Sequence, residues 1–571
     1  MSKRCKYLSV LGALLSLIVG IATLADAEYK VVSKGDALDL SVLLSPQYPC
    51  WWPGHAEYVR YDYRVIGPGA FRTHVTIIDE HTGTHFDAAP HFVPPPASGL
   101  PHATAYGVVT GEKVPIWQFV GEACVIDVTS ILDNASPGYS PEITPDMVEK
   151  WEKEHRPLSE GDVVIFYSGY SDKYYKPLPE GRRLVADPLA GKTPGWPSPS
   201  IECVKYLLSK GVKHVATDGA SMGHSDSRAA AVHCEGLGGG MIFTELLSGV
   251  GSVPNGSFFA FLPVKTEGSS GGPGRAVAIV DKELSASLND SAKKAKVVDL
   301  SVTLASDLPC WWPGTGVGDY SYIYMVAPFN DWTGFRGPYL TRAHIFDAHT
   351  GTHFDPPTHF LPDPGFDDNA YNDFVKGVLA DYNTKYGPRP TSSVYAADVP
   401  VEETMGPARI IDVADLVGTT KPSEWPKSPA ITVDQIKRHE ELYGPIEKGE
   451  VILFKTGHDD RYYLPFPYGD KCAADPLNGK SEGWPAPTAE AMIYLAEKGV
   501  KCAGIDAPSM GAVTSKEAIQ THWAGLSRGI NYVEFLTNLG DLPPKGAFFL
   551  FGALKEEGGK GANGRAIAIL P

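Results

Sequence analysis

One short segment of the sequence concentrates the side-chain types that bind metal ions. It reads His-x3-His-x-Asp-x3-His and occurs twice, as His81, His85, Asp87 and His91 and again as His349, His353, Asp355 and His359. Imidazole and carboxylate groups suit zinc, manganese or iron(II), and two histidines with one carboxylate leave coordination positions open for water and substrate. The pattern therefore predicts two catalytic metal sites.

The backbone around these residues is expected to turn sharply. An apolar, β-type run (residues 75–78, and 343–346 less clearly) leads into each motif, and Gly83 or Gly351 separates the two leading histidines. Glycine adopts backbone conformations that other residues avoid, so the turn can bring both imidazoles to one centre without a helix. This arrangement differs from the helical HExxH motif.

A second pair of ligand types follows each motif at matched spacing: His233 with Glu245, and His522 with Glu534. If these pairs fold back onto the first clusters, Asp87 and Asp355 can each bridge two cations. A lone histidine is more often a surface or core residue than a ligand. Of the 17 histidines, however, only the proposed ligands and His91 and His359 have a histidine at the aligned position of the other copy. We expect a divalent cation, zinc or manganese, with one or two ions per domain.

The whole chain repeats itself once. Asp-Leu-Ser-Val at 39–42 recurs at 299–302, Pro-Cys-Trp-Trp-Pro-Gly at 49–54 recurs at 309–314, and the order of motifs is unchanged. A period this long, present only twice, indicates domain duplication rather than a solenoid. We predict a first domain at 28–284 and a second at 297–571, joined by a polar linker near 285–296. The second copy carries added segments at about 363–399 and 332–337.

Each copy mixes short apolar runs with amphipathic helical patterns, which favours an α/β fold. Residues 163–167 and 451–454 are typical of buried strands. Ser198 and Pro199 are expected to begin a helix whose apolar stripe ends at Gly211, with a strand at 214–218 after it.

The first 27 residues are typical of a signal peptide: Lys3, Arg4 and Lys6 precede an apolar stretch at about 8–25, and small residues follow. Cleavage after Ala27 predicts a secreted or exported protein with no stable membrane insertion. The alternative is that the stretch is retained as a membrane anchor.

Net charge and cysteine content exclude some classes of partner and of scaffold. A formal net charge of -17 disfavours nucleic acid as a partner. Seven cysteines remain after residue 27, an odd and sparse set that excludes a disulfide-built scaffold but allows one or two bridges.

Taken together, these motifs resemble the metal-dependent cyclase family, which includes kynurenine formamidases and isatin hydrolases. The resemblance covers nearly all of both copies. It rests on the Asp-Leu-Ser start, the Trp-Pro-Gly turn, the HTGTHFD block, the His/Glu pair, the Gly-rich tail with Arg-Ala, and a late Asp-x-x-Ser (Asp218 with Ser221, Asp506 with Ser509).

The resemblance implies a role for each matched residue. The metal ligands would be His81, His85, Asp87, His233 and Glu245 in the first copy, and His349, His353, Asp355, His522 and Glu534 in the second. His91 and His359 would act as general base or acid. The implied fold is two tandem swivelling β/β/α domains, and because family members are commonly oligomers, we expect an intramolecular pseudo-dimer with further homo-oligomers as an option.

The expected activity is hydrolysis of a small aromatic amide, such as an N-formylkynurenine-like or isatin-like molecule, by water activated at the metal. Two alternatives remain: a polyketide-type cyclase or dehydratase, and a secreted protein that keeps the metal site without turnover. Trp51 and Trp52, with Trp311 and Trp312, are candidates to line the substrate pocket, although one tryptophan of each pair can equally be core.

Overall fold

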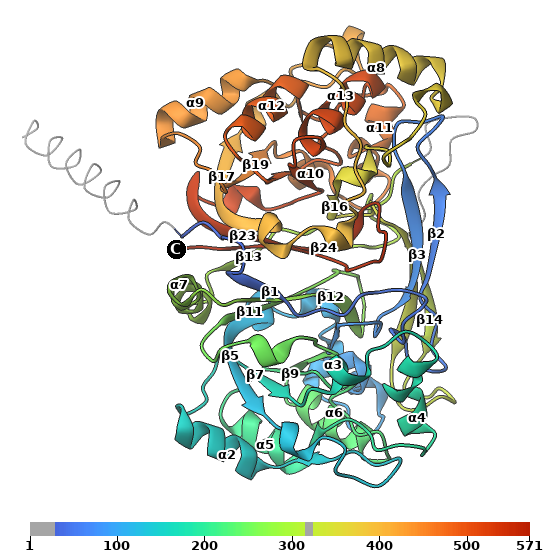
Figure 1. Cartoon of the computed structure of the whole chain (residues 1–571), viewed down its shortest axis with the longest axis vertical. Helices are drawn as coiled ribbons and strands as arrows, with labels where there is room; N and C mark the ends of the chain where they lie inside the picture. Colours follow the sequence, from blue (N-terminus) through green and yellow to red (C-terminus); the bar gives the residue numbers. More distant parts are fainter. Residues whose placement is uncertain (1–28, 314–323) are drawn as a thin grey trace, which may run out of the picture.

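The computed structural model describes residues 29–313 and 324–571, and it shows two similar α/β halves packed against each other (Figure 1). We call residues 29–284 the first copy and the described residues from 297 onward the second copy. The proposed signal peptide at 1–27 lies outside the described residues.

Each copy is built on an eight-stranded mixed sheet. In the first copy the strand order is β1 (Ala37–Asp39), β12 (Gly271–Ile279), β11 (Phe258–Pro263), β5 (Val120–Asp127), β7 (Asp162–Tyr167), β9 (His214–Thr217), β10 (Ile242–Glu245) and β4 (His85–Asp87). Because β4 also pairs with β12, the sheet closes on itself like a barrel. The parallel strands β5, β7, β9 and β10 are almost completely buried, as expected for strands covered on both faces.

The second copy repeats this arrangement. Its sheet contains β13 (Val297–Asp299), β24 (Ala562–Ile569), β16 (His353–Asp355), β22 (Asn531–Glu534), β21 (Cys502–Ile505), β19 (Val451–Lys455), β17 (Met405–Asp412) and β23 (Lys545–Ala553), and β23 pairs with β24 to close it. Two small parallel pairs accompany the barrels: β6 (Glu142–Ile143) with β8 (Ser198–Pro199), and β18 (Ala430–Ile431) with β20 (Ala486–Pro487). The predicted α/β class and the predicted strands at 163–167, 214–218 and 451–454 are confirmed.

Helices cover the outer face of each barrel. The first copy has α2 (Pro145–Glu154), α3 (Tyr170–Tyr174), α4 (Ala186–Leu189), α5 (Ile201–Ser209) and α6 (Ala229–Gly238), and α7 (Lys282–Lys293) leads from it to the second copy. The second has α8 (Asp373–Tyr386), α9 (Val433–Tyr443), α10 (His458–Tyr462), α11 (Ala474–Leu477), α12 (Ala489–Glu497) and α13 (Ser515–Leu526). One buried cluster joins Val148 of α2, Val204 of α5 and Val232 of α6 to Phe166 of β7, so these helices are held by apolar burial on the sheet.

The two copies share a four-stranded sheet, in the order β14 (Tyr324–Asn330), β15 (Thr341–Asp347), β3 (Thr73–Asp79) and β2 (Val59–Arg64). These strands run along one side of both copies in Figure 1. In the antiparallel β3–β15 pair, Ile77 lies opposite Ile345, its own counterpart in the repeat. The copies are therefore related by an approximate twofold axis, as in a pseudo-dimer within one chain.

Ion pairs reinforce this interface in a matched way. The Lys555 ammonium of the second copy lies 2.6 Å from Asp39 of the first, and Lys265 of the first lies 2.6 Å from Asp299 of the second. Arg275 completes the first of these groups, 2.8 Å from Asp39.

Three sequence-based expectations about local structure need correction. Residues 285–296, predicted as a linker, largely belong to α7, because Leu284 and Leu288 form an apolar pair at helical spacing that packs into the shared core. The predicted helix start at Ser198 is wrong, since Ser198 and Pro199 form β8 and the Ser200 hydroxyl caps the helix by accepting from the Cys203 amide.

The third correction concerns disulfide bridges. The sequence allows one or two, but the seven cysteines of the described residues are all free thiols. No helix within 29–313 or 324–571 is long and apolar enough to cross a membrane.

Candidate metal centres

Each HTGTH segment makes the tight turn that the sequence predicts. Gly83 and Gly351 have φ of +63° and +59°, in the left-handed region that favours glycine. A Cβ on Gly83 would lie 2.2 Å from the Leu44 Cδ2, and one on Gly351 would lie 2.1 Å from the Leu304 Cδ2. Both backbone conformation and close packing therefore require glycine at these positions.

In the first copy the turn brings His81, His85 and Asp87 together with the distal pair. The Asp87 Oδ1 lies 2.8 Å from the His81 Nδ1 and 3.6 Å from the His85 Nε2. The His233 Nε2 lies 3.3 Å from the Asp87 Oδ2 and 3.5 Å from the Glu245 Oε1. All five side chains are buried, so their charges act in a poorly screened environment.

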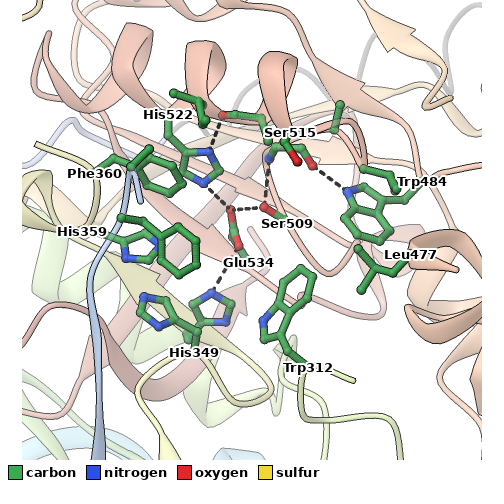
Figure 2. A pocket seen from close by; sticks show the side chains of 18 residues that line it. Trp312, His349, His359, Phe360, Leu477, Trp484, Ser509, Ser515, His522 and Glu534 are labelled. Carbon is green, nitrogen blue, oxygen red and sulfur yellow. Dashed lines mark hydrogen bonds and ion pairs between the residues drawn. The ribbon is translucent and has the colours of Figure 1, made fainter. Parts of the chain in front are cut away.

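The second copy holds the same constellation, of which Figure 2 labels His349, His522 and Glu534. The His353 Nε2 lies 3.6 Å from the Asp355 Oδ1 and 3.2 Å from the Glu534 Oε2, while the His522 Nε2 is 3.5 Å from both carboxylates. His349 differs from His81 because it turns its Nε2, at 3.3 Å, toward the aspartate.

Strand pairing explains why the distal residues reach the first cluster. Glu245 of β10 lies directly opposite His85 of β4, and Glu534 of β22 lies opposite His353 of β16. On helix α6 the His233 Nδ1 donates to the Ala229 carbonyl one turn earlier, and His522 does the same to Ala518 on α13. These bonds leave the Nε2 atoms facing the carboxylates.

The donor set fits a divalent cation. The Asp87 Oδ2, both Asp355 carboxylate oxygens and the His349 Nε2 are buried without a hydrogen-bond partner, which is costly unless another group satisfies them. Burial alone would lower the pKa of His233, but Asp87 and Glu245 outweigh it and raise that pKa to about 10. In the second copy, Asp347 and Asp355 outweigh the effect of burial and raise the pKa of His349 to about 10. Each centre thus has an excess of negative charge that a cation can neutralise, and imidazole with carboxylate suits Zn²⁺ or Mn²⁺.

The two candidate proton-transfer histidines are oriented by the opposite copy. The His91 Nδ1 donates to the Leu340 carbonyl at 2.8 Å, and the His359 Nδ1 donates to the Arg72 carbonyl at 2.8 Å. These bonds fix the tautomer, so that Nε2 remains as the acceptor in each ring. Burial is the largest cause that holds the pKa of both imidazoles well below the ordinary histidine value.

A cavity of about 320 Å³ opens onto the second-copy centre. Its walls include four of the five proposed ligands of this copy (His349, His353, His522 and Glu534), His359, and an aromatic and aliphatic lining of Phe71, Trp312, Phe360, Leu477 and Trp484 (Figure 2). The two tryptophans of the second copy therefore have different surroundings. Trp312 lines this cavity, whereas Trp311 packs against Phe466 with a ring separation of 5.5 Å.

Several residues that support the two centres were not predicted from the sequence. Asp79 and Asp347 accept from the backbone amides of His81 and His349 and so hold the turn. The aromatic residue that follows each candidate proton-transfer histidine stacks on the histidine of the distal pair: the Phe360 ring lies 4.0 Å from the His522 ring, and the Phe92 ring lies 4.3 Å from the His233 ring. The same His-Phe pair occurs at the matching position of both copies, and this repetition could have indicated that the phenylalanine belongs to the centre.

Two buried histidines without a counterpart in the repeat lie between the copies. The His74 Nε2 contacts Glu556 at 3.2 Å, and the His344 Nε2 contacts Glu80 at 2.9 Å, both in buried pairs that join the copies. They have structural roles at the interface.

Fold and centres together define a two-copy α/β protein with a pair of candidate metal sites. The sequence profile of the Cyclase family matches residues 38–224 and 298–512. An isatin hydrolase from Roseibium aggregatum is 27% identical over 228 residues, which cover 39% of this chain and 79% of that protein. A kynurenine formamidase from Bacillus mycoides is 24% identical over 243 residues, which cover 42% of this chain and 82% of that protein.

Among solved structures, an isatin hydrolase bound to the product analogue thioisatinate shares 21% identity with a TM-score of 0.40, covering 51% of this chain and 99% of its own. The profile match extends over most of both copies. The chain belongs to the Cyclase family and contains two tandem copies of its domain.

Proposed function

We propose that this protein is a metal-dependent hydrolase of small aromatic amides, of the arylformamidase or isatin hydrolase kind. The observation that carries the proposal is the position of an aromatic-lined cavity directly on a buried His/Asp/Glu centre, beside a histidine whose Nδ1–H is held by the Arg72 carbonyl. The named activities of the related proteins support the same chemistry. The swivelling β/β/α arrangement stays a prediction.

The ligands would be the five matched residues of each copy, with zinc or manganese as the cation. When bound, such a cation acts as a Lewis acid, lowering the pKa of a bound water to about 7 and polarising a carbonyl oxygen. His91 and His359 accept the proton of the attacking water at Nε2 and deliver it to the nitrogen that leaves. A C–O bond forms at the carbonyl carbon, the C–N bond breaks, and the proton ends on the amine.

The cavity walls supply binding and exclusion of water. Trp312, Trp484 and Phe71 offer flat apolar surfaces to an aromatic ring, and burial of that ring removes water from the reacting amide. A protein that only stored metal would need neither this opening nor an oriented imidazole beside it, so turnover is favoured over simple metal binding.

Hydrolysis of formanilide, followed with and without a chelator, tests the proposal. We expect activity that chelation abolishes and that zinc or manganese restores. His85→Ala and His353→Ala should each lower the metal content and the activity of one copy. His102→Asn is the control, because His102 is exposed and asparagine tolerates its left-handed backbone. Activity indifferent to chelation contradicts the mechanism.

We also propose that the chain is exported, and that it acts as a monomer because its dimer-like interface is internal. The signal-like segment supports export, and sequencing of the mature N-terminus tests it, since recovery of Met1 from secreted material would contradict cleavage. Light scattering tests the assembly. A mass above that of one 61.4 kDa chain would show that fusion does not complete the oligomer.

A further inference from the structure

Strands β3 and β15 connect the two centres directly. Phe71 and Arg72 precede β3 at the second-copy centre, and β3 ends at Asp79 beside the first-copy centre. Strand β15 runs antiparallel and mirrors this, beginning after Tyr339 and Leu340 at the first-copy centre. Each centre therefore has one wall that belongs to the other copy.

The wall residue of the second-copy centre is apolar. The Phe71 ring lies 5.7 Å from the His359 ring and 5.6 Å from the Phe360 ring, and it lines the cavity. Nothing on this ring can form a conventional hydrogen bond with a substrate.

The matching wall residue of the first-copy centre is Tyr339. Its ring lies 5.7 Å from His91 and 5.9 Å from Phe92, in the same relation that Phe71 has to its neighbours. The tyrosine hydroxyl lies 3.0 Å from the His55 Nε2, and the His55 Nδ1 lies 3.4 Å from the Asp79 Oδ1. The Asp79 carboxylate accepts from the His55 Nδ1–H, and the tyrosine hydroxyl is paired with the other ring nitrogen. A phenolic oxygen has two lone pairs, so whichever partner donates in this bond, at least one lone pair remains to accept a hydrogen bond from a substrate.

Two further wall positions differ in the same direction. Val513 and Ile519 line the second-copy cavity, whereas the aligned residues of the first copy are Ser225 and Ala230. The second-copy wall is thus more apolar at all three positions.

We propose that the two centres of this chain take different substrates, and that Tyr339 and Phe71, each supplied by the opposite copy, set the difference. The second-copy centre takes unsubstituted aryl amides. The first-copy centre takes aryl amides whose ring carries a hydrogen-bond donor, an amino or hydroxyl group, which is bound by the Tyr339 oxygen. This inference rests on the proposed amide hydrolysis.

Single-site proteins separate the two centres. His353→Ala leaves the first-copy centre and His85→Ala leaves the second, with elemental analysis confirming the remaining metal. Each is assayed with formanilide and with its ring-hydroxylated and ring-aminated analogues. We expect the ratio of kcat/KM for the donor-bearing analogues over formanilide to be about threefold to tenfold higher at the first-copy centre, the discrimination that one hydrogen bond provides.

Matched exchanges test the two residues. Tyr339→Phe in the His353→Ala protein should raise KM for the donor-bearing analogues about threefold to tenfold more than KM for formanilide, whereas a merely structural role would affect all substrates alike. Phe71→Tyr in the His85→Ala protein should raise the ratio of kcat/KM for the donor-bearing analogues over formanilide. The same exchanges in the two-site chain, which keep every metal ligand, give a second measurement of the ratio.

Equal ratios at the two centres, or a loss from Tyr339→Phe that is the same for every substrate, overturns the inference and leaves amide hydrolysis standing. Absence of hydrolysis of every formanilide by the metal-loaded two-site chain overturns the proposed function itself.

Discussion

Gly83→Ala is the sharpest probe of the turn that assembles the first-copy centre. A left-handed backbone costs a residue with a side chain about 1–2 kcal/mol. The new methyl group would also meet the Leu44 Cδ2 at 2.2 Å, and relieving such overpacking costs about 1–3 kcal/mol. The free energy of unfolding should therefore fall by about 4 kcal/mol.

A matched control isolates the clash from the backbone strain. Gly99 has φ of +68°, and no atom lies within 4 Å of the point where a methyl group would stand, so Gly99→Ala should cost about 1–2 kcal/mol only. The difference of about 2 kcal/mol corresponds to about 4–8 °C in Tm for a domain of this size.

Thermal denaturation and elemental analysis give the readout. The Gly83 carbonyl accepts from the His85 Nδ1 at 2.8 Å, so displacement of the turn should also reduce metal bound by the first copy while the second copy keeps its own. Equal melting temperatures and equal metal content for Gly83→Ala and Gly99→Ala would refute the account of this turn.

Two further predictions concern the interface between the copies. Asp39→Asn should cost about 3 kcal/mol at pH 7, because it leaves the buried Arg275 without its partner. Burial raises the pKa of Asp39, but Arg275 and Lys555 outweigh it and hold that pKa below its ordinary value. The stabilisation by Asp39 is therefore present above the unfolded-state pKa of about 3.9 and is lost as pH falls through the folded value. The free energy of unfolding of the Asp39→Asn variant should accordingly lie closer to that of the unchanged protein at pH 3 than at pH 7. Glu556→Gln should lower the free energy of unfolding by about 2 kcal/mol, because the buried Glu556 accepts from Tyr58 and contacts His74. Its exposed neighbour supplies the control Glu557→Gln, and equal denaturation midpoints for these two variants would contradict the assignment.

Local pattern was enough to predict much of the fold and of each centre. Apolar runs identified β7 and β19, because a buried parallel strand needs apolar side chains on both faces, and β9 was predicted from its place after a helix. Self-comparison separated the proposed ligands from histidines such as His74 and His344, since only a site kept in both copies places histidine at both aligned positions. The polar composition of α7 hid its Leu284 and Leu288 pair, so a linker was predicted where a helix packs.

The sequence alone was enough for the local features: which side chains gather in each candidate metal centre, and the glycine that lets a short segment bend so that they can. Tertiary structure alone decided that the centres are completed across the repeat. The carbonyls of Leu340 and Arg72 that orient His91 and His359 belong to the backbone, which every residue possesses, and so they leave no mark in the sequence. Their roles follow from the register that places Ile77 opposite Ile345, and that register is fixed by the packing of the two copies against each other.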